Sequence, residues 1–249
     1  MNSKPTSPEK KAKPQRPLAD PEKIKNRMKF QPSFGRTRSR PLTGKQKELM
    51  KTYFPKVSIT AEAVGSQEFK ARVAGKKLFL EIGFGVGEHL VHVAKTNPND
   101  IIIGCEVYQN SFGVTLQRSF NEGLYNVMFF QHDSRLLMDA LPEGSVDRLF
   151  ILFPDPWPKN RQQKRRIINQ QTIGLAHKIL KTGGVIRVAT DDIGYFESVL
   201  ELFAGDSRFK KVTDANKYKI VPDDHVETKY HKKALKEGRQ PGFVEFLKL

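Results

Sequence analysis

The sequence predicts an α/β protein with a doubly wound, mostly parallel sheet of seven strands. From about residue 76, short apolar segments alternate with longer amphipathic segments. This alternation is typical of parallel strands joined by right-handed helical crossovers. The last two apolar segments predict a C-terminal antiparallel hairpin that closes one edge of the sheet.

The first half of the predicted sheet contributes three strands and two helices. The first helix pattern ends before Asn97-Pro98, because proline disfavours a helical conformation in the residue that precedes it. In the second pattern, apolar residues recur at a spacing of four and a glycine follows them, which predicts one helix face and its end. The predicted strands are residues 78–82, 101–107 and 127–130, and the predicted helices are residues 88–95 and a segment through Phe112, Leu116 and Phe120 that ends at Gly123.

The second half repeats the pattern and then departs from it. We expect a long helix lined by Ile168, Thr172, Leu175 and Ile179, which ends at Gly183-Gly184. A basic stretch, residues 229–239, separates the two segments of the final hairpin. The remaining predicted elements are strands at 147–153 and 185–189, a helix at 195–203, and the hairpin strands at 209–212 and 242–247.

Most of the positive charge lies at the N-terminus. The chain has 249 residues and a formal net charge of +16, and residues 1–51 contain fifteen Lys and Arg against four acids. Residues 1–40 are rich in proline and poor in apolar side chains, so they cannot bury enough surface to offset their ordering entropy. We expect a disordered basic arm at 1–40, which acts as a polyanion tether or a solubilising tail. A single domain follows at 41–249, beginning with a short helix at 42–54.

The composition also excludes several classes of protein. No apolar run approaches the ~20 residues of a membrane span, and the first thirty residues lack the apolar core of a signal peptide. The single cysteine, Cys105, excludes an internal disulfide framework and a Cys-rich zinc site. The six histidines are scattered, so we expect no metal site. A reducing, cytoplasmic location fits these features.

A glycine loop follows the first predicted strand and opens the first helix. It contains Gly83, Gly85 and Gly87, which permit a tight turn and a close approach of a ligand to the backbone. The spacing is Gly-x-Gly-x-Gly, which weakens a dinucleotide interpretation. A strand, a glycine turn and a helix in this order nevertheless predict a ligand-binding crevice.

Acidic residues lie at the carboxyl ends of four of the predicted strands, where they line the expected edge of the crevice. The carboxyl ends of parallel strands face one crevice, so these acids are expected to converge on the same ligand. A cationic, adenosine-bearing ligand such as S-adenosylmethionine (SAM) suits them better than NAD, whose pyrophosphate they would repel. The four residues, with their expected partners, are Glu81 for an ammonium or sulfonium, Glu106 for the ribose hydroxyls, Asp133 for an adenine amino group, and Asp155 at the end of the fourth strand.

The fourth strand ends in an unusual segment, Pro-Asp-Pro-Trp-Pro-Lys at 154–159. Prolines on both sides restrict the backbone of Asp155, and Trp157 is the only tryptophan of the chain. A basic run at 161–166 comes next. A rigid acid, an aromatic plane and a basic run suit a nucleobase held by stacking and hydrogen bonds, with phosphates beyond it.

The sequence resembles the bacterial single-chain tRNA (guanine-N7-)-methyltransferases, which have the class I, Rossmann-like, SAM-dependent fold. The resemblance covers about residues 45–249. It is carried by residues 81–87, 103–107, His132-Asp133, 154–159, Thr190-Asp191 and 228–230. It implies methyl transfer from SAM to N7 of a guanosine in the tRNA variable loop, position 46, as a tRNA modification.

The resemblance also implies roles for individual residues. The glycine loop and the acids Glu81, Glu106, Asp133 and Asp155 would bind SAM. Relatives often have Glu where this chain has His231. The residues implied in substrate binding are Lys159, Asp191, Thr228, Lys229, Tyr230 and His231, and those implied in RNA contact are Arg161, Lys164, Arg165 and Arg166.

Guanine N7 carries a free lone pair at neutral pH, so its methylation needs alignment rather than a general base. Asp155 is the catalytic candidate, because a carboxylate would stabilise the charge that develops on the ring. Two alternatives remain, a class I methyltransferase that acts on ribosomal RNA or a protein, and a non-catalytic RNA-binding module. We expect no obligatory protein partner, and either a monomer or a homodimer.

Overall fold

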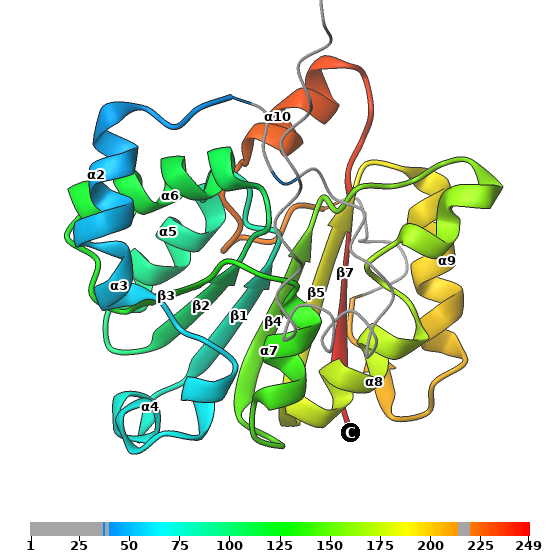
Figure 1. Cartoon of the computed structure of the whole chain (residues 1–249). Coiled ribbons are helices and arrows are strands. Elements are labelled where there is room, and N and C mark those ends of the chain that lie inside the picture. Colours follow the sequence, from blue (N-terminus) through cyan, green and yellow to red (C-terminus); the bar gives the residue numbers. More distant parts are fainter. Residues whose placement is uncertain (1–36, 38–39, 214–219) are drawn as a thin grey trace, which may run out of the picture. The chain divides into compact units, whose positions relative to one another are not determined.

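A computed structural model describes residue 37, residues 40–213 and residues 220–249. The expected arm at 1–40 therefore lies almost entirely outside the described residues. The described domain contains a seven-stranded sheet with the order β3-β2-β1-β4-β5-β7-β6 (Figure 1). Strands β1 to β5 are parallel to one another, and β7 is antiparallel to both β5 and β6. The predicted doubly wound fold and its antiparallel C-terminal edge are confirmed.

The strands and helices alternate along the chain as the apolar pattern predicts. The strands are β1 (Leu78–Ile82), β2 (Ile101–Cys105), β3 (Val127–Phe130), β4 (Val146–Leu152), β5 (Leu180–Thr190), β6 (Phe209–Lys211) and β7 (Gly242–Lys248). The helices are α2 (Gly44–Thr52), α3 (Phe54–Val57), η1 (Glu62–Gly65), α4 (Gln67–Val73), α5 (Glu88–Thr96), α6 (Gln109–Asn121), α7 (Ser134–Ala140), η2 (Asn160–Arg165), α8 (Gln170–Ile179), α9 (Ile193–Ala204) and α10 (Lys229–Lys236).

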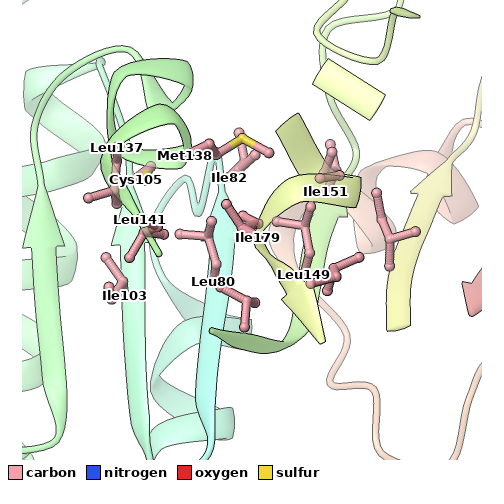
Figure 2. Close-up of a cluster of buried hydrophobic side chains, with 14 of the residues drawn as sticks. Leu80, Ile82, Ile103, Cys105, Leu137, Met138, Leu141, Leu149, Ile151 and Ile179 are labelled. Atoms are coloured by element: carbon pink, nitrogen blue, oxygen red, sulfur yellow. The ribbon is translucent and has the colours of Figure 1, made fainter. Parts of the chain in front are cut away.

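Each face of the sheet has its own apolar core. Figure 2 shows part of the first core, where Leu80 of β1, Ile103 of β2 and Leu149 of β4 meet Leu137 of α7 and Ile179 of α8. Helices α5, α6 and α2 cover the opposite face through a second cluster that includes Phe79, Leu90, Phe112 and Leu49. Alternate residues of one strand thus enter different cores, as the two-residue repeat of a strand requires.

The short helix predicted at 42–54 is present as α2 followed by α3. Thr43 caps α2 by accepting a hydrogen bond from the backbone amide of Gln46, whose side chain accepts in return from the amide of Thr43. Leu49 and Tyr53 are buried, and the Tyr53 hydroxyl donates to the carbonyl of Leu124. This N-terminal element is therefore anchored on the same face as α6.

The predicted end of the third long helix is wrong. Helix α8 ends at Ile179, and Gly183-Gly184 lies inside β5 instead of stopping a helix. Gly183 has a left-handed φ of 79°, and the pairing between β4 and β5 jumps from Val146 and Leu180 to Arg148 and Val185. The glycines therefore form a bulge in the strand, which a helical spacing pattern does not reveal.

Other elements were not predicted from the sequence. Helices α4 and α7 are each seven residues long, too short for a clear helical period. Helix α10 occupies most of the basic stretch between the last two strands. Among the described residues, no helix combines the length and the apolar character needed to cross a bilayer.

Candidate active site

The glycine loop joins β1 to α5 at the carboxyl end of the parallel sheet. Gly83, Gly85 and Gly87 have φ values of 74°, 55° and 76°, all in the left-handed region that favours glycine. Gly87 is the N-cap residue of α5 and has no side chain to satisfy the helix amides. The loop turns the chain tightly at this edge of the sheet, where Gly83 is exposed and Gly85 and Gly87 are buried.

Thr115 of α6 supports this loop from below. Its hydroxyl lies 3.1 Å from the carbonyl oxygen of Gly85 and is buried. A Cβ atom on Gly87 would lie 2.2 Å from the Thr115 methyl group, so the third glycine is required by packing as well as by its φ. No local sequence pattern indicates a role for Thr115, because its contact is with a residue thirty positions away.

Glu106 follows β2 and is held by the backbone around it. Its carboxylate accepts hydrogen bonds from the amides of Gly85, Val107 and Tyr108 at 2.8 to 3.0 Å. Burial raises the pKa of Glu106, the three amides oppose this shift, and the nearby Asp155 charge raises the pKa further. The carboxylates that follow β2 and β4 therefore lie close enough for their charges to interact, beside the glycine loop that follows β1.

The segment after β4 has a constrained backbone. Phe153 and Trp157 have φ values of 52° and 44°, which are rare for residues other than glycine and cost about 1–3 kcal/mol each. The amide of Phe153 donates to the carbonyl of Ala189, and the Arg166 side chain donates to the carbonyl of Pro156. Asp155 lies between these anchors and is exposed. Among the described residues it forms no hydrogen bond or ion pair.

The basic run after this segment divides into two kinds of residue. Arg161 and Lys164 of η2 are exposed, and the Arg165 guanidinium lies 5.0 Å from the centre of the Trp157 ring. Arg166 differs from the expectation of an RNA contact. It is 8% exposed, donates to Ser198 at 2.8 Å, and lies over the Tyr195 ring. Its guanidinium joins the Pro156 carbonyl to the Ser198 hydroxyl of α9. These donors are therefore engaged inside the domain and are not free to contact RNA.

Two of the expected cofactor acids are engaged within the protein. Asp133 caps α7 through the amide of Arg135 and also pairs with the Arg135 side chain. Glu81 does not lie on the edge of the crevice as expected, because it is 2% exposed and lies 2.8 Å from Nδ1 of His89. Contact between Glu81 and a ligand would therefore require this buried pair to rearrange.

The expected substrate segment at 228–231 begins α10. Thr228 is its N-cap, and the backbone amide of Lys229 donates to Glu88 at 3.0 Å. A Cβ atom on Gly85 would lie 3.1 Å from the Tyr230 ring, so this ring covers the glycine loop. Burial raises the pKa of Tyr230, and the charges of Glu106 and Asp155 raise it further. Unlike the exposed Lys229 and Tyr230, His231 is buried and points into the domain.

Asp191 and Lys159 complete the expected set. Asp191 follows β5 and pairs with Arg239 at 2.7 Å, which the sequence analysis did not anticipate. Lys159 is exposed at the N-cap of η2. Within the described ranges, no group of three or more His, Cys, Asp or Glu residues is arranged to hold a metal ion.

Comparison with known proteins identifies methyltransferases as relatives of this chain. A family model described as "Putative methyltransferase" matches residues 75–242. The tRNA (guanine-N(7)-)-methyltransferase of Hyphomonas neptunium is 40% identical over 205 residues, which cover 82% of this chain and 93% of the relative. The enzyme of the same description from Caulobacter vibrioides is 35% identical, with 86% and 93% covered.

A longer relative and a solved structure add to this comparison. The bifunctional methyltransferase of Rickettsia conorii is 37% identical over 85% of this chain, but the chain spans only 39% of that protein's length. The 16S rRNA methyltransferase KamB matches with a TM-score of 0.53 and 13% identity, covering 74% of this chain and 94% of KamB. At that identity, the structural match supports the fold alone.

We predict that Gly87→Ala destabilises the domain much more than Gly123→Ala. Both glycines have left-handed φ values, 76° and 63°, but an added Cβ meets Thr115 only at Gly87 and nothing within 4 Å at Gly123. The difference should be about 1–3 kcal/mol in the free energy of unfolding, measured by urea denaturation. Equal losses in the two variants would show that the loop relaxes away from Thr115.

Proposed function

The chain belongs to the tRNA (guanine-N(7)-)-methyltransferase family, and on this basis we propose that it methylates N7 of a guanosine in tRNA. The family and the fold imply a SAM-type methyl donor. Relatives of that description match across most of this chain, and they support the choice of acceptor. A guanosine of the variable loop is the specific site that we propose.

The observation that carries this proposal is the proximity of the glycine loop, Glu106 and Asp155 at the carboxyl ends of the parallel strands. The two carboxylates are close enough for the Asp155 charge to raise the pKa of Glu106. Asp155 has no ion pair among the described residues, so a cationic ligand would relieve the repulsion. SAM carries such a cation, its sulfonium, and this group makes the attached methyl electrophilic. The donor set therefore fits SAM better than an anionic dinucleotide.

We assign binding roles on that basis. Glu106 would accept from the ribose hydroxyls, since a carboxylate fixed by three amides still has lone pairs to offer. The left-handed glycines would let the backbone approach the donor closely. Asp133 would accept a hydrogen bond from the adenine amino group through the carboxylate lone pairs that Arg135 does not use. Glu81 would act through His89 rather than by direct contact, because it is buried.

The protein's task in the reaction would be alignment. Guanine N7 would attack the methyl carbon with its own lone pair while the bond from that carbon to sulfur breaks and neutral S-adenosylhomocysteine leaves, so no residue has to remove a proton from N7. Asp155, held by left-handed residues on both sides, would stabilise the positive charge that develops on the ring. The Tyr230 ring over the glycine loop would exclude water from the reacting atoms. Trp157 would form the wall of the base pocket.

The remaining contacts would select the acceptor. Asp191 would accept hydrogen bonds from the guanine N1–H and exocyclic amine. Its ion pair with Arg239 would break when the base binds. Lys159 would bind O6 or a phosphate. Arg161, Lys164 and Arg165 would bind the RNA backbone, with residues 1–40 as a further basic arm. We propose that the enzyme works in the cytoplasm, as a monomer or homodimer.

The direct test is methyl transfer to unmodified tRNA transcripts with SAM, followed by nucleoside mass spectrometry and mapping. We expect 7-methylguanosine in the variable loop, and none when that guanosine is replaced by adenosine. SAM binding without a tRNA product would indicate another acceptor, such as ribosomal RNA or a protein. No SAM binding would leave an RNA-binding module.

Asp155→Asn is expected to lower kcat by about 10²–10³-fold, because it removes the charge opposite the developing cation. Glu143→Gln is the matched control, since Glu143 is exposed before β4, at the opposite end of the same strand. Single-turnover rates and SAM affinity are measured separately. Full turnover in Asp155→Asn with SAM bound normally would remove Asp155 from the catalytic role.

Replacing both Arg161 and Lys164 by alanine should weaken tRNA binding while SAM affinity stays unchanged. If both cations contact phosphates, the slope of log affinity against log salt should fall by about 1.5. Lys210→Ala with Lys211→Ala, two exposed residues of β6, is the charge-matched control. The same slope in wild type and in the η2 variant would place the RNA elsewhere.

A further inference from the structure

Residues 220–231 cross one face of the sheet and then form the first turn of α10; they are called the segment below. The segment lies on the face that α5 also covers, where His225 packs on Phe243 and His89 packs on Phe150. It ends with Tyr230 over the glycine loop, and α10 lies beyond the carboxyl ends of the parallel strands (Figure 1). The contacts that hold this segment therefore also fix the cover of the proposed SAM site.

Ion pairs hold the start of the segment. Asp224 contacts Arg148 at 2.9 Å and Arg187 at 2.7 Å, and both arginines also contact Glu245 of β7. Burial alone would raise the pKa of Asp224, but the two arginines outweigh it and lower the pKa to about 2. This anchor stays charged throughout the physiological pH range.

Histidines hold the end of the segment. Nε2 of His225 lies 3.2 Å from Nδ1 of His231, and the His225 ring lies 5.9 Å from the His89 ring. His89 in turn contacts Glu81 of β1 at 2.8 Å. Buried Glu81 and His89, half-buried His225 and buried His231 thus form a continuous series of contacts from β1 to α10.

The geometry disfavours a second proton on His225, whose two ring nitrogens have different surroundings. The contact between Nε2 of His225 and Nδ1 of His231 needs one N–H and one lone pair, so a proton on each facing nitrogen would abolish it. On the other side of the ring, Nδ1 of His225 is buried and has no acceptor among the described residues. A second N–H on His225 would therefore be unsatisfied as well as charged.

The surrounding charges reinforce this state. Burial, then His89, His231 and Arg187, lower the pKa of His225 to about 3, although Asp224 opposes them. Burial also lowers the pKa of His231, against the nearby Glu227. The other charged groups facing the pair are Glu81 behind His89, and Arg148 and Glu245 around Asp224.

We propose that His225 and His231 are positioning residues, whose neutral pair holds residues 228–230 over the glycine loop and releases them when His225 gains a proton. The proposal rests on the proposed function only in placing SAM beneath Tyr230. Neither histidine touches the reacting atoms, and the pair acts through the backbone that carries Tyr230.

The sign of the pH dependence follows from linkage. A histidine in the released segment titrates near its ordinary pKa of 6.5, whereas His225 in the held segment titrates near 3. Below pH 6.5 the released state therefore binds the additional proton. The ratio of released to held segment should rise about tenfold for each pH unit below 6.5, and should be constant above it.

Hydrogen exchange of the α10 amides measures this ratio without any assay of catalysis. The full chain is followed from pH 7.5 to 5.0, with rates corrected for intrinsic exchange and with α9 as the internal reference. Wild-type α10 should lose about tenfold in protection between pH 6 and pH 5. The KM for SAM should rise over the same range, while kcat should change less.

The test variant combines His225→Gln with His231→Asn, which place amides near Nε2 and Nδ1 and cannot titrate. We expect α10 to be protected in this variant, with no change between pH 6 and pH 5. His177→Asn, on α8, is the control and should keep the wild-type slope. A wild-type α10 whose protection does not change with pH would overturn the proposal even if the double variant fails to fold. Equal slopes in wild type and the double variant would overturn it too.

Discussion

A row of side chains across four strands anchors residues 220–231, the segment that places Tyr230 over the glycine loop. Glu81 of β1, Phe150 of β4, Arg187 of β5 and Glu245 of β7 are in register and face the same side of the sheet. Arg187 is 3% exposed, and a buried guanidinium is tolerated only with partners that offset its desolvation. Glu245 and Asp224 provide them, which brings residues 220–231 onto the sheet. Disrupting this row would leave buried charges unpaired and the segment unanchored.

The crevice itself depends on backbone geometry rather than on side-chain reach. Three left-handed glycines turn the chain after β1, and the amide of Gly85 binds Glu106 at the end of β2. Thr115 then fixes the same loop from α6. Two neighbouring strands and two helices thus determine one carboxylate position, which is the preorganisation that a positioning enzyme requires.

Strain is concentrated at the candidate catalytic acid. Phe153 and Trp157 adopt left-handed conformations on either side of Asp155, and buried contacts from Ala189, Arg166 and Ser198 hold them there. The energetic cost of the two residues is carried by the surrounding packing. The carboxylate between them is exposed and has no hydrogen bond or ion pair inside the described domain. Arg166, which the resemblance implied in RNA contact, instead holds the backbone next to Asp155.

The sequence by itself determined the order of the strands and of the longer helices, the glycine loop and the acids at the strand ends, because these follow from local periodicity and chain order. It also indicated the family through several short motifs, of which the segment at 154–159 is the most specific. Only the tertiary structure decided which polar groups are already engaged. It buried Glu81, Arg166 and His231, paired Asp191 with Arg239, and placed Thr115 under the glycine loop. Such contacts join residues distant in sequence, and burial depends on what packs above each side chain, so no local pattern encodes them.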